Sequence, residues 1–383
     1  MNKSAPAFFT ILKDFRYFCH QIQFLQTNYC MLLFLTVKNR FLLVLLSFSL
    51  FFSACSTDFD LADDWKEGMA LYGLINPEDS VHYVRINKVF LDPETDALVI
   101  AQNPDSIYYY ENLDVTIREL PNGPEWTAQQ IDGNLTDINK SEGIFSNERN
   151  ILYRFNFQPN LDRNYQITAT NSETGYTVSS VTGLVGELQM TFPTNPVVTQ
   201  INKLSTNRQT IRFNTPENGR VYDLKIRFLY EEWEIGDSDN KELKSVEWTA
   251  FSGLTSPGTS GGTLLTFQYD NREFYNQLAN RIPADNSKRR RVKPLGSIQY
   301  IFISGGEEIY NYIISEGAQS GLSDGSAGSV YSNIENGYGV WSSRSTSSFG
   351  DFRITPTSVD SLACGSLTRQ LNFADRAGFF DCN

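Results

Sequence analysis

The chain has 383 residues, with 32 Lys and Arg against 44 Asp and Glu, two His and five Cys. Its content of 40% hydrophobic and 13% aromatic residues is enough to build a buried core, which excludes a disordered acidic chain. The net charge of −12 argues against a nucleic-acid partner, because such proteins gain most of their affinity by neutralising phosphates.

The N-terminal segment has the pattern of a secretion signal. Lys38 and Arg40 precede an uncharged run of 14 residues from Phe41 to Ala54. This run is shorter than the roughly 20 residues of a membrane-spanning helix and fits the apolar region of a signal peptide. The small residues before Cys55 resemble the lipobox of bacterial lipoproteins. We expect Cys55 to carry diacylglycerol and then palmitate; an ordinary signal peptide and a transmembrane anchor are the alternatives.

Residues 1–54 are therefore expected to be a leader and signal peptide. Starting at Met31 would give a conventional short basic region, so we expect Met31 to be the true start, with a long leader as the alternative. Removing residues 1–54 takes away five basic residues and one acidic residue, which leaves 27 and 43 and a net charge of −16. Such a surface repels anionic lipid. We expect residues 55–68 to tether the protein to the outer membrane, with the periplasmic and cell-surface faces both left open.

Short alternating strands follow the tether. Alternation of apolar and polar residues, with Gly, Asn and Pro between the runs, is typical of an all-β protein. We predict a mainly antiparallel, immunoglobulin-like β-sandwich domain over residues 69–190. His82 lies in one of the runs and is interpreted as a strand-surface residue rather than a catalyst. The expected strands are Met69–Ile75, Tyr83–Phe90, Leu113–Glu119, Leu152–Phe157, Tyr165–Thr170 and Tyr176–Val181.

The insertion at residues 91–110 ends in three tyrosines, Tyr108, Tyr109 and Tyr110. Loops between strands often carry binding residues, and these rings could stack on a glycan or a peptide. The alternative, which we favour, is that they cover the core of their own domain. Trp341 follows a predicted tight turn and has the same two interpretations, with core packing again favoured.

Two prolines mark residues 191–196 as a linker to a second β-sandwich-like domain, 197–383. Val221–Glu234 is its longest predicted strand, with Ser245–Phe251 as its hairpin partner and Ser297–Ser304 as a later strand. The alternating residues Tyr222, Leu224, Ile226 and Phe228 should face the core. Apolar residues at helical spacing predict one short helix near residues 271–282. The basic run that follows it, residues 288–293, is expected to be a solvated loop, and residues 315–329 to be mobile.

Acidic residues at Glu231, Glu232 and Glu234 raise the question of catalysis, since glycosidases use two carboxylates. Glu232 and Glu234 would share one face of a strand with Cβ atoms about 7 Å apart. Any charged strand has this geometry, so we assign no catalytic residue and expect a protein that is not an enzyme. We also expect no metal site and no cofactor. His82 is the one histidine after residue 54, which argues against sites that need several imidazoles.

If Cys55 carries lipid, Cys364 and Cys382 remain as a pair in an oxidising compartment, the setting in which disulfides form. A bridge would close a loop of about 19 residues and stabilise the protein by roughly 3 kcal/mol in the chain-entropy model. Two free thiols are the alternative.

Three features together carry a resemblance: the lipobox at Cys55, the strand pair Leu71–Ile75 and Val84–Phe90, and the motif Tyr331–Val340. The chain resembles uncharacterised Bacteroidota surface lipoproteins, and among them the domain-of-unknown-function 4249 family. The long strand at residues 221–234 departs from the commoner form of that family. The resemblance implies an all-β outer-membrane lipoprotein that works near a TonB-dependent receptor, and it assigns no catalytic residues.

We therefore expect a lipid-anchored, non-enzymatic binding or accessory subunit beside an outer-membrane β-barrel transporter, with a glycan or a peptide as ligand. A glycan-active hydrolase using the acidic residues near Glu231–Glu234 and a purely structural envelope protein are the alternatives.

Overall fold

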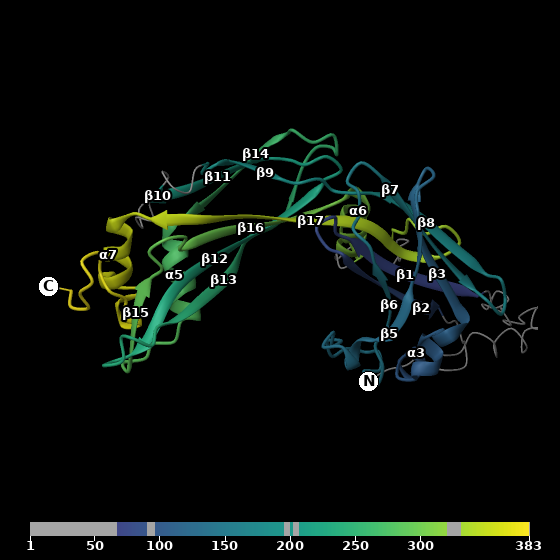
Figure 1. Cartoon of the computed structure of the whole chain (residues 1–383), viewed down its shortest axis with the longest axis horizontal. Helices are drawn as coiled ribbons and strands as arrows, with labels where there is room; N and C mark the ends of the chain where they lie inside the picture. Colours follow the sequence, from purple (N-terminus) through teal and green to yellow (C-terminus); the bar gives the residue numbers. More distant parts are fainter. Residues whose placement is uncertain (1–66, 90–95, 195–199, 202–206, 320–330, 383) are drawn as a thin grey trace, which may run out of the picture. The chain divides into compact units, whose positions relative to one another are not determined.

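The computed structural model describes residues 67–89, 96–194, 200–201, 207–319 and 331–382. Most of the secondary structure is β-strand, in mainly antiparallel sheets with few helices (Figure 1). The expected all-β fold class is therefore confirmed. The leader, the lipobox at Cys55 and most of the tether lie outside the described residues.

The largest sheet runs through both halves of the described chain, in the order β13-β12-β16-β17-β1-β2-β6-β5. Two further strands join it, β10 beside β17 and β15 beside β12. All its pairs are antiparallel except β1 with β17 and β10 with β17. Its strands are β1 (Gly68–Ile75), β2 (Val81–Val89), β5 (Gln129–Asp132), β6 (Ile151–Asn156), β10 (Gln200–Ile201), β12 (Val221–Glu234), β13 (Glu242–Thr255), β15 (Lys288–Val292), β16 (Ile298–Gly305) and β17 (Tyr338–Ile354).

Two smaller sheets pack against parts of this one. The four-stranded sheet has the order β4-β3-β7-β8 and the three-stranded sheet the order β14-β11-β9. Their strands are β3 (Leu113–Leu120), β4 (Glu125–Thr127), β7 (Asn164–Asn171), β8 (Thr177–Gly183), β9 (Gln189–Phe192), β11 (Arg208–Asn214) and β14 (Leu264–Asp270). The helices are α3 (Ala97–Ala101), α4 (Pro104–Ile107), α5 (Asn271–Arg281), α6 (Glu307–Gln319) and α7 (Pro356–Cys364), with 3₁₀ turns η1 (Tyr110–Asn112), η2 (Gly133–Leu135) and η3 (Arg369–Leu371).

The N-terminal hydrophobic cluster lies between β1, β2 and β6 on one side and the four-stranded sheet on the other. Alternating residues of each strand point into it, as Leu71, Val84, Ile117 and Ile167 do. Trp341 also belongs to this cluster, although it lies far along the chain. The predicted domain limits of 69–190 stay a prediction, and the core within that range is completed by a later strand.

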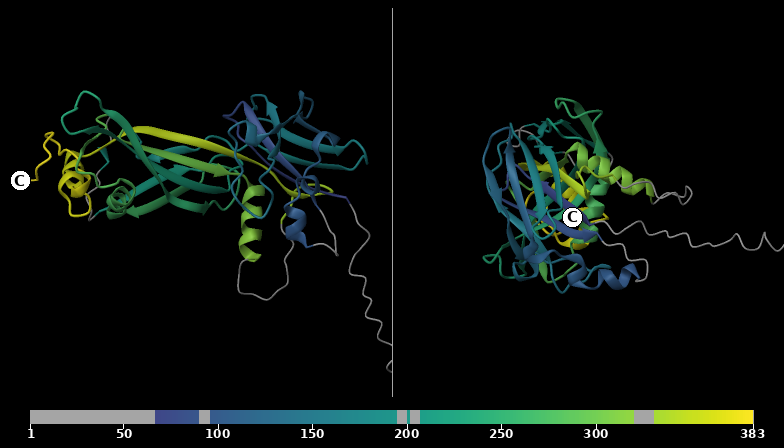
Figure 2. Two further views of the ribbon diagram at one scale, coloured as in Figure 1. Left: turned by 90° about the horizontal axis from the view of Figure 1, so that it is seen from below. Right: turned by 90° about the vertical axis from the view of Figure 1, so that its right-hand side faces the viewer.

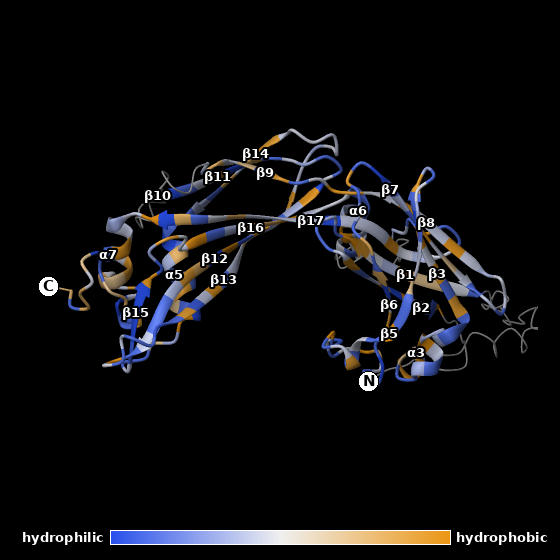
Figure 3. Cartoon of the chain, viewed as in Figure 1, coloured by the Kyte–Doolittle hydropathy of each residue, from blue (hydrophilic) through white to orange (hydrophobic). Residues whose placement is uncertain are grey.

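The second cluster is built around β12, whose residues Tyr222, Leu224, Ile226 and Phe228 are all fully buried, as predicted. Apolar and polar residues alternate along this strand (Figure 3). The three-stranded sheet and α5 contribute to the same cluster, for example through Phe274. The predicted strand Val221–Glu234 therefore has the correct limits and the correct buried face.

The long strand β17 belongs to both clusters. Its first part lies parallel to β1, from the pair Ala70 and Tyr338 onward, and supplies Trp341 to the N-terminal cluster. Its last part lies beside β16 and supplies Phe352 and Ile354 to the other cluster. A hydrogen-bonded strand therefore joins the two clusters, in addition to the chain between Leu184, which belongs to the first cluster, and Leu188, which belongs to the second. Residues 191 and 192 of the predicted linker lie in β9.

The predicted helix is α5, which begins after its cap Asp270 and ends one residue before the predicted limit. Two other helices, α6 and α7, were missed. α6 covers residues 307–319, so residues 315–319 of the segment expected to be mobile are helical; residues 320–330 lie outside the described chain. α7 has Thr355 as its cap and Pro356 in its first turn, a start signal that the sequence already contained.

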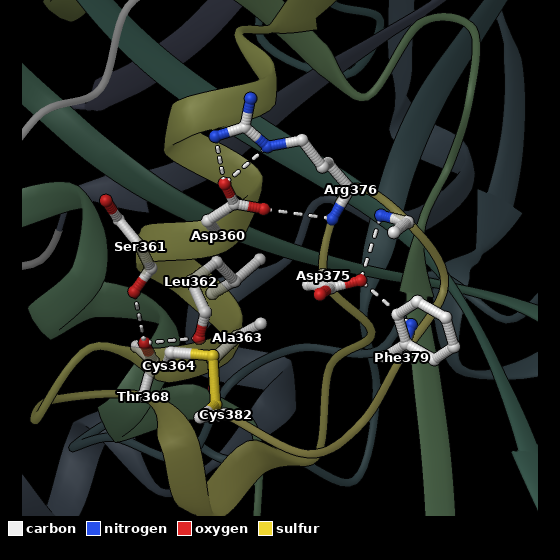
Figure 4. The surroundings of a disulfide bond; sticks show 11 residues. Asp360, Ser361, Leu362, Ala363, Cys364, Thr368, Asp375, Arg376, Phe379 and Cys382 are labelled. Atoms are coloured by element: carbon white, nitrogen blue, oxygen red, sulfur yellow. Dashed lines mark hydrogen bonds and ion pairs between the residues drawn. A yellow bond between two sulfur atoms is a disulfide. The ribbon is translucent and has the colours of Figure 1, made fainter.

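A disulfide joins Cys364, the last residue of α7, to Cys382 in the C-terminal tail (Figure 4). The predicted pair is therefore confirmed. The carboxylate of Asp360 also holds the tail, because it accepts from the backbone N–H of Arg376 at 3.0 Å and forms an ion pair with its guanidinium. Covalent and ionic contacts thus fasten the tail against α7.

We expect Cys382→Ser to lower the free energy of unfolding by about 3 kcal/mol, because the unfolded chain is no longer constrained by the loop. Chemical denaturation under non-reducing conditions measures this. Asp360→Asn weakens a largely exposed ion pair and should cost less than about 1 kcal/mol. A loss for Cys382→Ser no larger than for Asp360→Asn would contradict the prediction.

His82 lies in β2 and is buried, with 3% of its surface exposed, so the expected strand-surface position was wrong. It lies two positions before Val84 and four before Ile86, which face the core. Because alternate residues of a strand point to the same face, the sequence already placed His82 on the core side. Its Nε2 lies 3.2 Å from the carbonyl oxygen of Phe157, and the two rings are 4.7 Å apart. Burial lowers the pKa of His82 below the ordinary 6.5.

This lowered pKa predicts a loss of stability on acidification. As the pH falls below 6.5, the unfolded chain binds a proton at His82 before the folded chain does. The contribution of neutral His82 to the free energy of unfolding is therefore fully present above pH 6.5. It is lost as the pH falls from 6.5 to the lowered pKa of the folded protein. Urea titrations from pH 7.5 downward, with His82→Gln as the comparison, measure it. A constant difference between the two proteins at all pH values would exclude this linkage.

Candidate functional site

The segment from Asp96 to Asn112 forms two short helices and a 3₁₀ turn at one end of the N-terminal strands. The carboxylate of Asp96 caps α3 by accepting from the N–H of Leu98 at 2.9 Å. The side chain of Asn103 caps α4 by accepting from the N–H of Asp105 at 3.1 Å, and Pro104 occupies the first turn. These caps explain why the stretch is helical.

Tyr108 and Tyr109 point into the protein, with 0% and 5% of their surfaces exposed. The hydroxyl of Tyr108 donates to the carbonyl oxygen of Arg149 at 2.9 Å, and that of Tyr109 donates to the carbonyl oxygen of Gly68 at 3.0 Å. Burial raises the pKa of both phenols. Both rings pack in the N-terminal cluster, which is the arrangement favoured from the sequence.

Tyr110 differs from its two neighbours. Its backbone has φ = +51°, a left-handed conformation that costs a bulky residue of order 1–3 kcal/mol. Its hydroxyl donates to Oδ1 of Asp105 at 2.8 Å. Burial, and then the hydrogen bond to Asp105, raise the pKa of Tyr110 to about 12. The phenol donates its proton to Asp105, and its oxygen can still accept a hydrogen bond from a ligand.

Tyr110 lines a surface pocket of about 740 Å³. Three carboxylates surround this pocket with a single guanidinium, that of Arg149, so its charge is negative. Most of the lining side chains are exposed, which makes the pocket open to solvent. The lining residues are Asn103, Pro104, Asp105, Tyr110, Glu111, Asn112, Gln130, Glu148 and Arg149. Amides, carboxylates and a phenol together suit a ligand rich in hydroxyl groups rather than an anion.

The pocket is assembled from three separate parts of the chain. Residues 103–112 form one wall, Gln130 comes from β5, and Glu148 and Arg149 precede β6. Asn112 fixes the rim, because its side chain donates to Glu173 at 2.8 Å. Of the lining residues, the sequence had singled out Tyr110 as a binding candidate. The others are ordinary polar loop residues, and their proximity depends on the folded strands.

Trp341 lies outside this pocket and is fully buried. Its indole N–H donates to the carbonyl oxygen of Tyr165 at 2.9 Å. The predicted turn before it is present, with positive φ at Asn336 and Gly339. The side chain packs between the sheets, again the arrangement favoured from the sequence.

The acidic run at the end of β12 faces the basic run, which forms strand β15. The expectation of a solvated loop at residues 288–293 was therefore wrong. Each carboxylate has its own cation directly opposite: Glu231 pairs with Arg291, Glu232 with Arg290 and Glu234 with Lys288. The carboxylate oxygens that the hydrolase alternative would use are engaged by these cations.

The part of the chain that the structure describes contains no cluster of three or more His, Cys, Asp or Glu residues suited to a metal ion. Within that same part, no helix combines the length and the apolar character needed to cross a bilayer. Compared with known proteins, the chain matches no family model, and no curated protein sequence is significantly similar to it.

Proposed function

We propose that this protein is a lipid-anchored, non-enzymatic binding subunit of the outer membrane, which serves an adjacent β-barrel transporter. The observation that carries the proposal is the polar pocket around Tyr110. A strained backbone persists only where the surroundings hold it, and such strain gathers at ligand sites. Here it directs the phenol of Tyr110 to Asp105 at the wall of the pocket.

The ligand class follows from the lining of the pocket. Carboxylates and side-chain amides bind hydroxyl groups through paired hydrogen bonds. Aromatic rings supply the apolar contact that the faces of sugar rings need. The excess of Asp105, Glu111 and Glu148 over Arg149 repels anions. We therefore propose an uncharged glycan as the ligand, in preference to an acidic peptide or a phosphorylated compound.

Support for the anchor comes from the sequence. The apolar run ending at Ala54 and the following Cys55 have the order of a lipoprotein signal. Two or three acyl chains on Cys55 are enough for stable attachment, whereas a single chain is not. The first described residue, Glu67, stands 12 positions after Cys55.

The partner is tested in intact cells carrying a tagged chain, by crosslinking and purification. We expect one β-barrel transporter in near-equal amount with the tagged protein. The matched control is Cys55→Ser, which removes the acylation site. Recovery of abundant envelope proteins alone, in amounts equal for the two chains, would contradict the accessory role.

The ligand is tested by measuring binding of the purified protein to a panel of neutral and acidic glycans. We expect Tyr110→Ala to weaken binding of a neutral glycan at least tenfold, which corresponds to about 1.4 kcal/mol. Tyr338→Ala is the matched control, because Tyr338 is 59% exposed and lies outside the pocket. Binding that is equal in both variants, or restricted to acidic glycans, would contradict the assignment.

A further inference from the structure

Four exposed apolar side chains lie beside the pocket on two segments that are hydrogen-bonded to each other, α3 and the loop before β6. Leu98, Val99 and Ile144 are 57%, 63% and 58% exposed, and Phe145 is 37% exposed. We call these four residues the α3 surface. Single exposed apolar residues are common on proteins, whereas a group of them marks a contact surface.

Two hydrogen bonds hold the two parts of the α3 surface together. The side chain of Gln102 donates to the carbonyl oxygen of Ile144, and the N–H of Ser146 donates to the carbonyl oxygen of Ala101 at 2.9 Å. Figure 2 shows α3 protruding from the strands in both views. The four side chains are therefore presented outward by a short, braced element.

The α3 surface lies at the end of the sandwich where the tether enters. Gly68, the first residue of β1, pairs with Val89 at the end of β2, and its carbonyl oxygen accepts from Tyr109. Lys88, one residue earlier on β2, donates to the carbonyl oxygen of Asp105 in α4. The two short helices are thus packed beside the start of the first strand.

The length of the tether limits how far this end can move from a bilayer. Residues 56–67 separate Cys55 from Gly68. Fully extended, the steps from Cys55 to Gly68 span at most about 47 Å. A chain acylated at Cys55 therefore keeps the start of β1, and the helices beside it, within that distance of the lipid headgroups.

We infer that the α3 surface inserts into the headgroup boundary of the membrane that holds the lipid of Cys55. This inference rests on the proposed anchor. Burying exposed apolar side chains in that boundary is favourable, and the anchor makes the contact intramolecular. The occupant is a zwitterionic lipid surface, because the net charge of −16 expected after cleavage opposes an anionic one. The overall charge alone predicts a protein held away from the membrane, whereas this local apolar group brings one end to it.

One consequence concerns the pocket. The α3 surface and the pocket share the stretch from Ala97 to Asn112. Insertion of Leu98 and Val99 therefore places the pocket close to the membrane surface. There it would face the extracellular or periplasmic mouth of a transporter embedded in the same bilayer. This position would suit the proposed role as a binding subunit of that transporter.

The test uses the lipidated full-length product, purified from membranes and reconstituted into phosphatidylcholine vesicles. In the mature chain Cys55 is acylated and Cys364 and Cys382 are bridged, so Leu98→Cys introduces the one thiol available for a fluorescent NBD label. Leu243→Cys is the matched control, because Leu243 is 58% exposed on β13. Spin-labelled phosphatidylcholine is then added as the quencher.

We expect at least twofold quenching of the label at position 98 and none above background at position 243. Equal quenching at the two positions, in protein that co-floats with the vesicles, would overturn this inference and leave the anchor in place. Protein that does not co-float with vesicles would overturn the anchor, and this inference with it.

Discussion

Replacing Arg290 with leucine is expected to lower the free energy of unfolding by about 3–5 kcal/mol. The guanidinium is 1% exposed and donates to Glu232 at 2.7 Å and to the carbonyl oxygens of Leu371 and Pro283 at 2.6 and 3.1 Å. Without it, a mostly buried carboxylate has no counter-charge and two carbonyl groups lose their donor. Such losses cost more than the original pair contributes.

Arg291→Leu is the matched control, on the next position of the same strand. Arg291 pairs with Glu231, but its side chain is 45% exposed, so the loss should stay below about 1 kcal/mol. Chemical denaturation followed by tryptophan fluorescence measures both variants. Equal losses would show that burial of the ion pair does not matter here.

The ion pair between Arg290 and Glu232 also allows a test of the proposed catalytic alternative for the acidic residues of β12. Glu232→Gln keeps the size of the side chain but removes its charge, so it should destabilise the protein by disturbing the contact with Arg290. The ion pair with Arg290 is lost under either interpretation, so a hydrolase using Glu232 would lose turnover in addition to this stability, while the variant is still folded. Measuring stability and glycan hydrolysis on the same variant therefore separates the structural role from the catalytic alternative.

Replacing Trp341 with alanine is expected to cost about 3–5 kcal/mol, the range for large aromatic side chains removed from a core. The ring is fully buried and lies directly against Gly73 on β1, where an added Cβ would come within 2.8 Å of it. The indole N–H also satisfies the carbonyl oxygen of Tyr165. The variant therefore creates a cavity and leaves a buried acceptor without its donor.

Tyr338→Ala, three residues earlier on β17, is the control. Tyr338 is 59% exposed, so the change should stay within about 0.5 kcal/mol. Thermal and urea unfolding of the two variants provide the measurement. Unchanged stability in Trp341→Ala, together with lost ligand binding, would contradict the core role and support the binding interpretation.

Much of the fold could be predicted from the local alternation of apolar and polar residues. The alternation in Val221–Glu234 predicted both its limits and its buried residues, because a strand sends successive side chains to opposite faces. The disulfide was readable because Cys364 and Cys382 were an isolated pair. The alternation along this strand also placed His82 on the same buried face as Val84 and Ile86. The polar imidazole ring nevertheless led to the prediction of a surface position.

Other features depended on contacts between distant parts of the chain. The basic run at residues 288–293 looks solvated in isolation, and only its pairing with β12 brings each cation opposite an acid. α6 was missed because Gly305 and Gly306 precede it and a Gly/Ser-rich stretch follows it, which made the whole segment resemble a loop. The pocket was missed because Gln130, Glu148 and Tyr110 meet only after β5 has paired with β6 and the four-stranded sheet has packed on the N-terminal cluster.

Sequence patterns were enough to predict the all-β class, most strands and their inner faces, the helix α5 and the pairing of Cys364 with Cys382. These properties follow from residue periodicity and from the count of cysteines, which are local or simple global features. The tertiary structure alone decided that two of the three consecutive tyrosines are buried while Tyr110 lines a pocket. It did so because strand pairing and helix capping, which join residues far apart in the chain, set the direction of each ring.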